Sequence, residues 1–344
     1  MFQLLLPRHH GLRAVLLISI MASIWFLFYI KSSYDIISSH IAIIGPSSSS
    51  SSAWHADFPV APNNDDVADL CARYRLEPFT PPAAAANHPS SSSSLDKNNN
   101  TSPTRKIYDL LLVNTELEML ELRLAQMYPH VDHVVILESP VTFTNQPKPL
   151  HVLDSWARYA PYHDKIIRHT IDVAALALSP DPSTWDLEHA SRNALFSQVI
   201  PYLAGPQAAR PGDVLLVSDV DEIPKPATLA ALRVCAFPRR LALASDAYYY
   251  SFQWRSSEDW PWPHATFYEG PDDTVSPQDL RAGDGAKTGE SGRMQNAAWH
   301  CSYCFDSFRL MRNKLESFSH TELDKPEFKD PKAVLQRVRL GKDL

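Results

Sequence analysis

Short apolar runs alternate with longer amphipathic stretches from residue 106 onward. Apolar runs of roughly four to eight residues between turn formers are typical of strands buried inside a sheet. Such strands are predicted at residues 108–113, 134–137, 166–173 and 214–217. Strands that alternate with helices indicate an α/β domain, in which helices cover both faces of a sheet.

Helical periodicity fills the gaps between these strands. Apolar residues recur at spacings of three and four between residues 117 and 127, so they form one stripe that faces a core. Residues 185–203 predict a long amphipathic helix that carries Arg192, and residues 227–235 predict a shorter one. Residues 108–138 therefore have the length of one strand, helix and strand unit with parallel strands.

An aromatic alternation follows in residues 247–254. An extended backbone would place four aromatic rings on one side of a strand: Tyr248, Tyr250, Phe252 and Trp254. Aromatic faces bind sugar rings, but such a stripe on a strand is more often part of a core. Trp260 and Trp262, in the segment expected to be a loop, are the better candidates for contact with a sugar ring.

Polar residues follow the last of the buried strands, where it should leave the sheet. The sequence GDVLLVSDVDEIP, residues 212–224, places Asp219 and Asp221 directly after the apolar run. In extended backbone the side chains at i and i+2 share a face, so both carboxylates can point at one cation. Hard ions such as Mg or Mn bind one or two protein carboxylates together with substrate phosphates. The motif therefore predicts a metal and nucleotide-diphosphate site, at the strand ends where open α/β sheets bind ligands.

A histidine late in the chain is a candidate third metal ligand. His300 lies in the segment AAWHCSYCFDSF, residues 297–308, and imidazole is an acceptable ligand for Mn. The alternative is that His300 is structural, as isolated histidines usually are.

Composition sets the class of protein. The chain has 344 residues, 44% of them hydrophobic, and a net charge of -7, so it can bury a sizeable core and is not expected to bind nucleic acid. The 4 cysteines allow three pairings, which the sequence leaves open. For the Cys-x-x-Cys motif at residues 301–304, a role in a structural disulfide is favoured over a redox or zinc function.

The N-terminal part predicts a membrane anchor and a stem. Residues 14–30 carry no charge and are long enough to span a bilayer, and basic residues before them favour a cytoplasmic tail at residues 1–13. A cleaved signal peptide is the alternative. Residues 31–105 are rich in Ser, Pro and Asn, which predicts a disordered stem, with two overlapping glycosylation sequons that begin at Asn99 and Asn100.

Three blocks of the sequence carry a resemblance to glycosyltransferase family 17. They are ELEMLELRLAQMYPHVDHVVILESPVTFTNQPKPL, LLVSDVDEIPKPATL and AAWHCSYCF, and the likeness covers residues 106–344. It implies a single-pass type II Golgi membrane protein with a lumenal GT-A-like nucleotide-sugar domain. It also implies UDP-GlcNAc as donor, a divalent metal, and β-1,4 transfer of N-acetylglucosamine to mannose of an N-glycan on a glycoprotein. Asp219 and Asp221 match the family's Asp-Val-Asp motif, and members generally continue some tens of residues past Leu344, so the chain is expected to be truncated.

Further residues are candidates for binding and catalysis. Glu138 directly follows the strand predicted at residues 134–137, and Lys148 lies in the proline-rich loop after it. Arg192 lies on the long helix. These three are candidate donor-binding residues. Inversion at the sugar needs a carboxylate that takes the proton of the acceptor hydroxyl. Glu316 and Glu322 are candidates for this base, and each is equally well explained as a surface charge.

Two other functions fit parts of the pattern. A phosphohydrolase of the haloacid dehalogenase type also places an Asp-x-Asp motif after a strand, and Asp272 and Asp273 follow downstream. Such domains normally carry the motif on their first strand, whereas a complete strand, helix and strand unit comes first here. A catalytically inactive, membrane-anchored sugar-binding protein is the third hypothesis, and it would bind donor without turnover.

Overall fold

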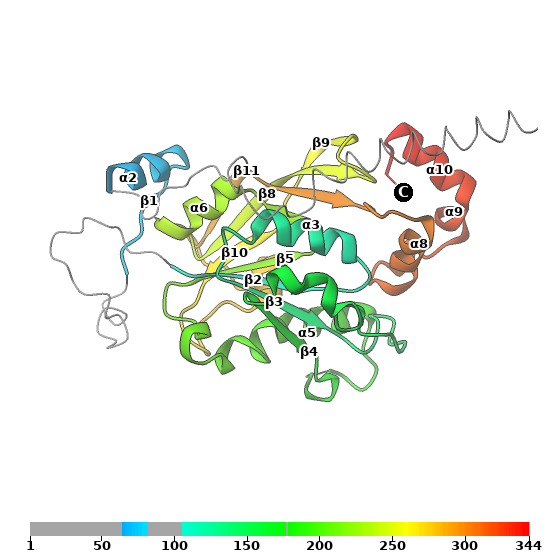
Figure 1. The fold of residues 1–344 in the computed structure, drawn as a ribbon, viewed down its shortest axis with the longest axis horizontal. Coiled ribbons are helices and arrows are strands. Elements are labelled where there is room, and N and C mark those ends of the chain that lie inside the picture. Colours follow the sequence, from blue (N-terminus) through cyan, green and yellow to red (C-terminus); the bar gives the residue numbers. More distant parts are fainter. Residues whose placement is uncertain (1–63, 82–104, 177, 344) are drawn as a thin grey trace, which may run out of the picture. The chain divides into compact units, whose positions relative to one another are not determined.

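The structure is a computed structural model that describes residues 64–81, 105–176 and 178–343. Within these residues a large mixed sheet organises the chain (Figure 1). In spatial order its main path is β4 (Ile166–Thr170), β3 (His133–Glu138), β2 (Ile107–Leu112), β5 (Val214–Asp219), β10 (His264–Phe267), β8 (Arg240–Tyr249), β11 (Ser291–Ser302) and β6 (Glu222–Pro224). Strand β9 (Arg255–Trp260) pairs with β8 outside this path.

One half of the sheet is parallel and the other half is mixed. Strands β4, β3, β2 and β5 are parallel, and β10 lies antiparallel between β5 and β8. Strand β11 is parallel to β8, and β6 closes the edge antiparallel to β11. Leu112 on β2 lies opposite Asp219 on β5, so the carboxyl ends of these parallel strands meet at one edge. The predicted α/β class, with parallel pairing of β2 and β3, is confirmed, whereas the antiparallel strands β10 and β6 were not predicted.

Helices cover both faces of the parallel half. Alternate residues of β2 enter different clusters, because side chains on a strand alternate between faces. Leu111 packs in the cluster that includes Leu120 of α3 (Leu117–Met127), whereas Leu110 packs in the cluster that includes Leu195 of α5 (Thr184–Ser197). Helix α6 (Pro226–Val234) joins the first cluster and α7 (Pro277–Ala282) joins the second.

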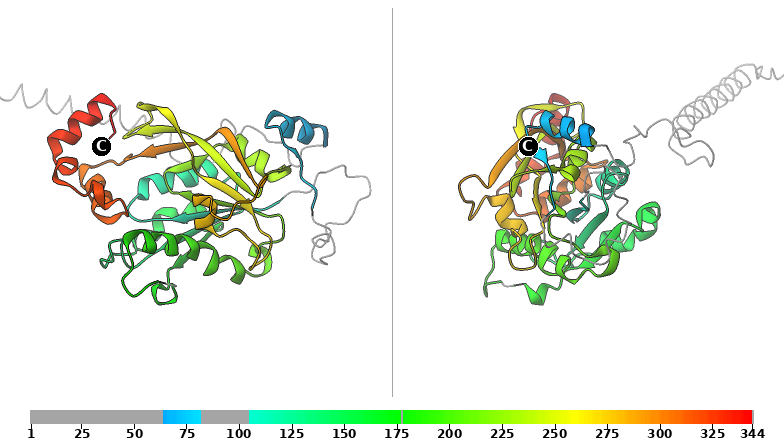
Figure 2. Two further views of the ribbon diagram at one scale, coloured as in Figure 1. Left: turned by 180° about the vertical axis from the view of Figure 1, so that it is seen from behind. Right: turned by 90° about the vertical axis from the view of Figure 1, so that its left-hand side faces the viewer.

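A third cluster covers the ends of β8 and β11. It brings together Tyr250, Tyr303, Met311, Leu315 and Val334. Tyr303 follows β11 directly, whereas Met311, Leu315 and Val334 belong to the C-terminal part of the chain, which folds into α8 (Phe308–Ser317), α9 (Pro326–Lys329) and α10 (Pro331–Leu340). Figure 2 shows these helices gathered beyond the end of β11. Shorter elements are α4 (His151–Asp154) and the 3₁₀ helices η1 (Trp156–Tyr162), η2 (Val173–Ala175), η3 (Ile200–Tyr202), η4 (Gly205–Gln207) and η5 (Thr321–Leu323).

Two predicted elements end earlier than the sequence indicated. The long helix ends at Ser197 and is followed by η3, and the strand that begins at Ile166 ends at Thr170. The aromatic strand is wrong beyond Tyr249, because Tyr250 takes a φ of 62° and the chain turns there. Phe252 and Trp254 therefore lie in the turn between β8 and β9, partly exposed, and do not extend an aromatic face.

Part of the range predicted as stem is folded. Helix α2 (Asn64–Arg73) buries Val67, and β1 (Glu77–Pro78) pairs with β7 (Cys235–Ala236). A disulfide between Cys71 and Cys235 fixes α2 to this pair, and a second joins Cys301 and Cys304. The predicted anchor at residues 14–30 and the glycosylation sequons lie outside the described residues. In residues 64–81, 105–176 and 178–343, no helix is both long and apolar enough to cross a bilayer.

Candidate active site

The Asp-Val-Asp motif forms a turn between β5 and β6. Asp219 is the last residue of β5, and its backbone N–H donates to Oε2 of Glu222 at 2.9 Å. Val220 is buried in the core below, as its apolar side chain requires. Arg123 of α3 holds the turn from beneath, because its Nη1 donates to the carbonyl oxygens of Asp219 and Glu222 at 3.3 and 2.5 Å.

Arg123 is itself fixed by a buried ion pair. Its guanidinium donates to both carboxylate oxygens of Asp109 on β2, at 2.6 and 2.8 Å, and both side chains are almost fully shielded from solvent. Bidentate pairs of this kind fix geometry as well as charge. The turn that carries the motif is therefore anchored to β2 and α3 independently of any ligand.

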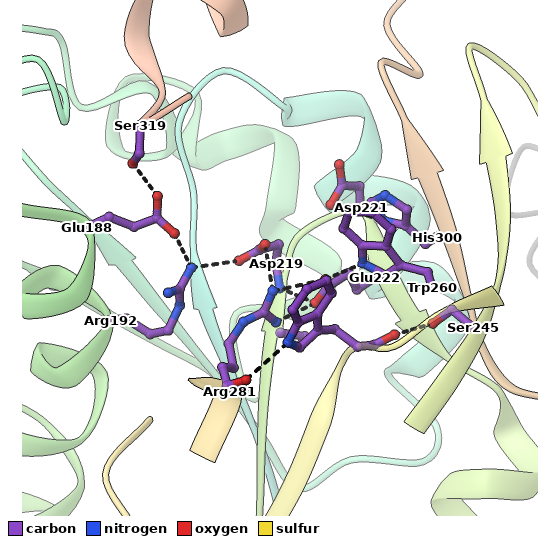
Figure 3. Close-up of polar contacts among 12 residues, drawn as sticks. Glu188, Arg192, Asp219, Asp221, Glu222, Ser245, Trp260, Arg281, His300 and Ser319 are labelled. Atoms are coloured by element: carbon purple, nitrogen blue, oxygen red, sulfur yellow. Dashed lines mark hydrogen bonds and ion pairs between the residues drawn. The ribbon is translucent and has the colours of Figure 1, made fainter. Parts of the chain in front are cut away.

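Asp219 lies between two arginines. Nη2 of Arg281 donates to its Oδ2 at 3.1 Å, and Nη2 of Arg192 lies 3.8 Å from its Oδ1. Burial alone would raise the pKa of Asp219, but the positive charges of Arg281, Arg192 and Lys314 lower it to about 2. Asp219 is therefore ionised, and in Figure 3 it is turned toward Arg192 and Arg281.

Asp221 has different partners. Nζ of Lys314 on α8 donates to its Oδ2 at 3.0 Å, and Nδ1 of His300 on β11 lies 3.7 Å from its Oδ1. Burial would raise the pKa of Asp221, but Lys314 and His300 outweigh burial and lower it. The expectation that both aspartates point at one object is not met: the backbone turns at Val220, and each carboxylate has its own set of partners.

His300 is held in one orientation. Its ring stacks on Trp260, with centroids 4.2 Å apart and planes 9° apart, and its Nε2 shares a hydrogen bond of 2.7 Å with Oγ of Ser302. Trp260 in turn donates from Nε1 to Glu222 at 2.8 Å. Nδ1 of His300 is shielded from solvent, faces Asp221, and has no hydrogen-bond partner among the described residues. The arrangement therefore aims one unused ligand atom at a carboxylate (Figure 3).

A cavity of about 440 Å³ opens beside these residues. This volume lies in the range of small-molecule sites, about 300–1,000 Å³. It is bounded by the carboxyl ends of β2, β3 and β5, by α5, and by the segment after β11. Its polar lining comprises Asn114, Glu116, Ser139, Thr142, Lys148, Glu188, Ser191, Arg192, Asp219, Asp221, His300, Ser302, Lys314, Ser317, His320 and Asp343.

The comparisons identify the family. The model of glycosyltransferase family 17 matches residues 83–344, which is more than half of the chain. The chain belongs to glycosyltransferase family 17. A comparison with curated proteins finds no match. The resemblance seen in the three sequence blocks is confirmed, and with it the assignment to the glycosyltransferases.

The phosphohydrolase hypothesis gains no support from the structure. Asp272 and Asp273 are exposed in the turn after β10 and do not line the cavity. The strand that carries the motif lies in the middle of the sheet, after a complete β2, α3 and β3 unit. A transferase is the reading that the family assignment supports.

The structure separates the candidate donor-binding residues. Arg192 and Lys148 line the cavity of the family 17 domain, and Nζ of Lys148 is shielded from solvent without a hydrogen-bond partner in the described part of the chain. Burial lowers the pKa of Lys148, although Glu138 and Glu116 act in the opposite direction. Glu138 is fully buried and does not line the cavity, because its carboxylate accepts the backbone N–H groups of Val152 and Leu153 at 2.7 and 3.0 Å.

Neither candidate base reaches the cavity. Glu316 is on the outer face of α8, where it pairs with Arg312 and Lys329, and exposed Glu322 hydrogen-bonds His320 at 2.6 Å. Residues i and i+2 of a helix lie about 200° apart around its axis, so Glu316 points away from the side occupied by Lys314. The carboxylates that do line the cavity, besides the two aspartates, are Glu116, Glu188 and Asp343.

Sequence reasoning missed several residues of the site, among them Glu222, Arg281 and Lys314. Glu222 is fully buried and accepts from Arg281 at 2.7 and 3.1 Å, so it belongs to the motif that Asp219 begins. Lys314 could have been found, because it follows Met311 by three positions and therefore shares the buried face of its helix. No local signal marks Arg281, which reaches the site only through the packing of α7.

The predicted metal set of Asp219, Asp221 and His300 is not assembled as three ligands. Among the described residues, no group of three or more His, Cys, Asp or Glu side chains could hold a metal ion. Asp219 is committed to the arginines, which leaves Asp221 and His300, whose unpartnered Nδ1 fits a ligand role. A carboxylate with substrate phosphates is the usual arrangement for Mg and Mn, and an imidazole is an acceptable further ligand for Mn, so these two residues fit half of a metal site.

Proposed function

We propose that this family 17 chain is an inverting transferase with a GT-A-like nucleotide-sugar domain. It moves N-acetylglucosamine from UDP-GlcNAc to a mannose residue of an N-glycan in β-1,4 linkage, with Mn or Mg. One observation carries the proposal: Asp219 and Asp221, at the carboxyl end of β5, open with His300 into a cavity that two cations, Arg192 and Lys148, also line. Carboxyl ends of strands are where open α/β sheets bind their ligands.

The cavity residues suit a donor that carries two phosphates. Guanidinium and ammonium groups form charge-assisted hydrogen bonds with phosphate oxygens, and Arg192 and Lys148 supply one of each. Asp221 and His300 would hold the divalent ion, which would supply charge neutralisation for the departing diphosphate. Asp219 is fixed by two arginines beside this site, so its negative charge is already balanced.

Inversion requires a base on the side of the sugar opposite the diphosphate. The acceptor hydroxyl gives its proton to a carboxylate, its oxygen bonds to the anomeric carbon, and the bond from that carbon to the phosphate oxygen breaks to release UDP. Glu116, Glu188 and Asp343 are the candidates for this base, because they line the same cavity. Glu188 is held by Arg192 and by the hydroxyl of Ser319, which fixes the position of its carboxylate.

UDP release tests the proposal directly. The purified full chain is incubated with UDP-GlcNAc and a mannose-terminated N-glycan, with and without manganese. We expect UDP release that requires both acceptor and metal, and a product mass increased by one N-acetylhexosamine. Binding of UDP by folded protein without any turnover would favour the sugar-binding protein instead, and hydrolysis of a generic aryl phosphate would favour the phosphohydrolase.

For the cellular setting, we propose a single-pass type II Golgi membrane protein with a lumenal catalytic domain, anchored by residues 14–30. The disulfides Cys71–Cys235 and Cys301–Cys304 support an oxidising compartment, where such bonds persist. Sensitivity of the expressed chain to an N-glycosidase, abolished by Thr101→Ala together with Ser102→Ala, would support a lumenal position. An unglycosylated chain that remains accessible to antibody without permeabilising the Golgi membrane would contradict it.

A further inference from the structure

Lys314 is paired with the aspartate that the proposed metal site needs. It lies in the last turn of α8, lines the cavity, and donates to Oδ2 of Asp221 at 3.0 Å. Its Nζ also lies 3.9 Å from Oε1 of Glu116, at the start of α3. One ammonium group therefore balances two carboxylates that belong to different elements.

The other charges at this edge of the sheet have partners that do not depend on Lys314. Arg281 pairs with Glu222 and with Asp219, and Arg192 pairs with Glu188. Asp221 differs, because its side chain is only 7% exposed and its permanent positive partner is a lysine on the C-terminal helix α8. A lysine has a flexible stem and can leave one anion for another without moving its helix.

The same carboxylate cannot serve Lys314 and a divalent ion equally well. An ion held by Oδ1 of Asp221 and Nδ1 of His300, which are 3.7 Å apart, would lie close to an ammonium that is hydrogen-bonded to Oδ2. Like charges at that range repel strongly when water is largely excluded. A diphosphate in the cavity would change this balance, because its oxygens offer Lys314 a new anionic partner.

We propose that Lys314 makes metal binding depend on the donor's diphosphate. Without nucleotide, the ammonium holds Asp221 and opposes binding of a divalent ion. When the diphosphate enters, Lys314 transfers its hydrogen bond from Asp221 to a phosphate oxygen, and Asp221 becomes available together with His300. Lys314 is thus a positioning residue that couples two ligands. This inference rests on the proposed diphosphate donor and metal.

Metal affinity measured with and without nucleotide tests the coupling. Calorimetric titration of the full chain with Mn²⁺ alone and with saturating UDP needs no turnover. For the wild-type chain we expect UDP to raise the Mn²⁺ affinity about 100-fold, near the upper end of measured couplings. In Lys314→Met we expect tighter binding of Mn²⁺ alone and a UDP effect of less than about tenfold. By reciprocity, Mn²⁺ should raise the affinity for UDP by the same factors.

Matched variants separate charge from packing. Lys329→Met makes the same substitution at a lysine on α9 that pairs with Asp324 and Glu316 outside the cavity, and it should behave as wild type. Lys314→Gln removes the charge but can still donate a hydrogen bond to Asp221. It should reproduce Lys314→Met, and it serves in its place if the methionine variant does not fold.

The outcomes distinguish this inference from the proposed function. An unchanged UDP effect in both folded Lys314 variants would overturn the coupling role and leave the metal-dependent transfer intact. A wild-type chain that binds UDP but no Mn²⁺ under either condition would overturn the metal site, and with it the coupling. A wild-type chain that does not bind UDP would overturn the proposed donor.

Discussion

Two parallel strands of the sheet, β3 and β5, end in acidic residues whose surroundings differ. Glu138 at the end of β3 is fully buried, and its carboxylate receives two backbone N–H groups from the first turn of α4. Asp219 and Asp221 at the end of β5 are held by side chains of α5, α7 and α8, and they line the cavity. The sequence alone made both strand ends candidates for ligand binding.

The type of partner separates a structural acid from a functional one. Nη1 of Arg168 also lies 3.9 Å from Oε2 of Glu138. The backbone N–H groups at the helix terminus, however, cannot move away without unwinding the helix, so Glu138 is fixed as a cap for α4. A lysine on its flexible stem can exchange one anion for another, so Lys314 can leave Asp221 for a ligand. Position at the carboxyl end of a strand therefore does not by itself make an acidic residue part of a binding site.

The largest expected effect is at the end of β5. Asp221→Asn should lower metal-dependent UDP release about a thousandfold, because it removes the charge that would hold the metal at the leaving diphosphate. The fold should persist, since the amide oxygen can still accept from Lys314. Initial rates and far-UV circular dichroism provide the measurement. Asp272→Asn, at an exposed position outside the cavity, is the matched control and should retain full activity.

At the end of β3, a substitution is expected to lower stability and to leave turnover nearly unchanged. Glu138→Gln places an NH₂ group where two backbone N–H donors converge, so at least one loses its acceptor, at a cost of about 1–3 kcal/mol in the free energy of unfolding. Turnover per folded molecule should stay within about twofold of wild type, because Glu138 does not line the cavity. Urea unfolding measures the predicted loss of stability, and UDP release measures the predicted turnover. If the unfolding free energy were unchanged and turnover were lost, Glu138 would be a functional residue like Asp221 and not a structural one.

Local patterns predicted the fold better than the site. Hydrophobic periodicity depends only on residues that are close in the sequence. It predicts the strand around Leu110, the helix around Leu120 and the motif strand that ends at Asp219. The resemblance to family 17 came from three local blocks and is confirmed by the family match. By contrast, the pairing of Cys71 with Cys235 spans 164 residues and depends on how α2 packs.

The partners of the aspartates were not predictable for the same reason. Lys314 and Arg281 come within hydrogen-bond distance of the motif only after α8 and α7 have packed against the sheet. Glu316 was singled out for its charge and its place late in the chain, and neither property reports which side of a helix it occupies. A helical wheel of α8 would have favoured Lys314, because Met311 and Leu315 define its buried side.

A smaller effect concerns acid stability. The folded-state pKa of Asp219 is about 2, below its usual value of 3.8, because Arg281 and Arg192 outweigh burial. Its contribution to stability is therefore fully present above about pH 4 and is lost as the pH falls toward about 2. Because the side chain is 43% exposed, solvent screening keeps this contribution modest. Urea midpoints of wild type and Asp219→Asn should differ more at about pH 5 than at about pH 3. A difference that does not change with pH would show that the arginines do not stabilise the fold through the charge of Asp219.

The smallest effects are expected at the two acids that the structure places outside the cavity. Glu316→Gln and Glu322→Gln should each leave UDP release within about twofold of wild type, since Glu316 pairs with Arg312 and Lys329 on the surface and Glu322 with His320. Glu188→Gln, at a lining position, is the comparison and should lower the rate more than either. A tenfold or larger loss in Glu322→Gln, with an unchanged unfolding temperature, would mean that the segment after α8 closes on the donor and brings this acid to the acceptor.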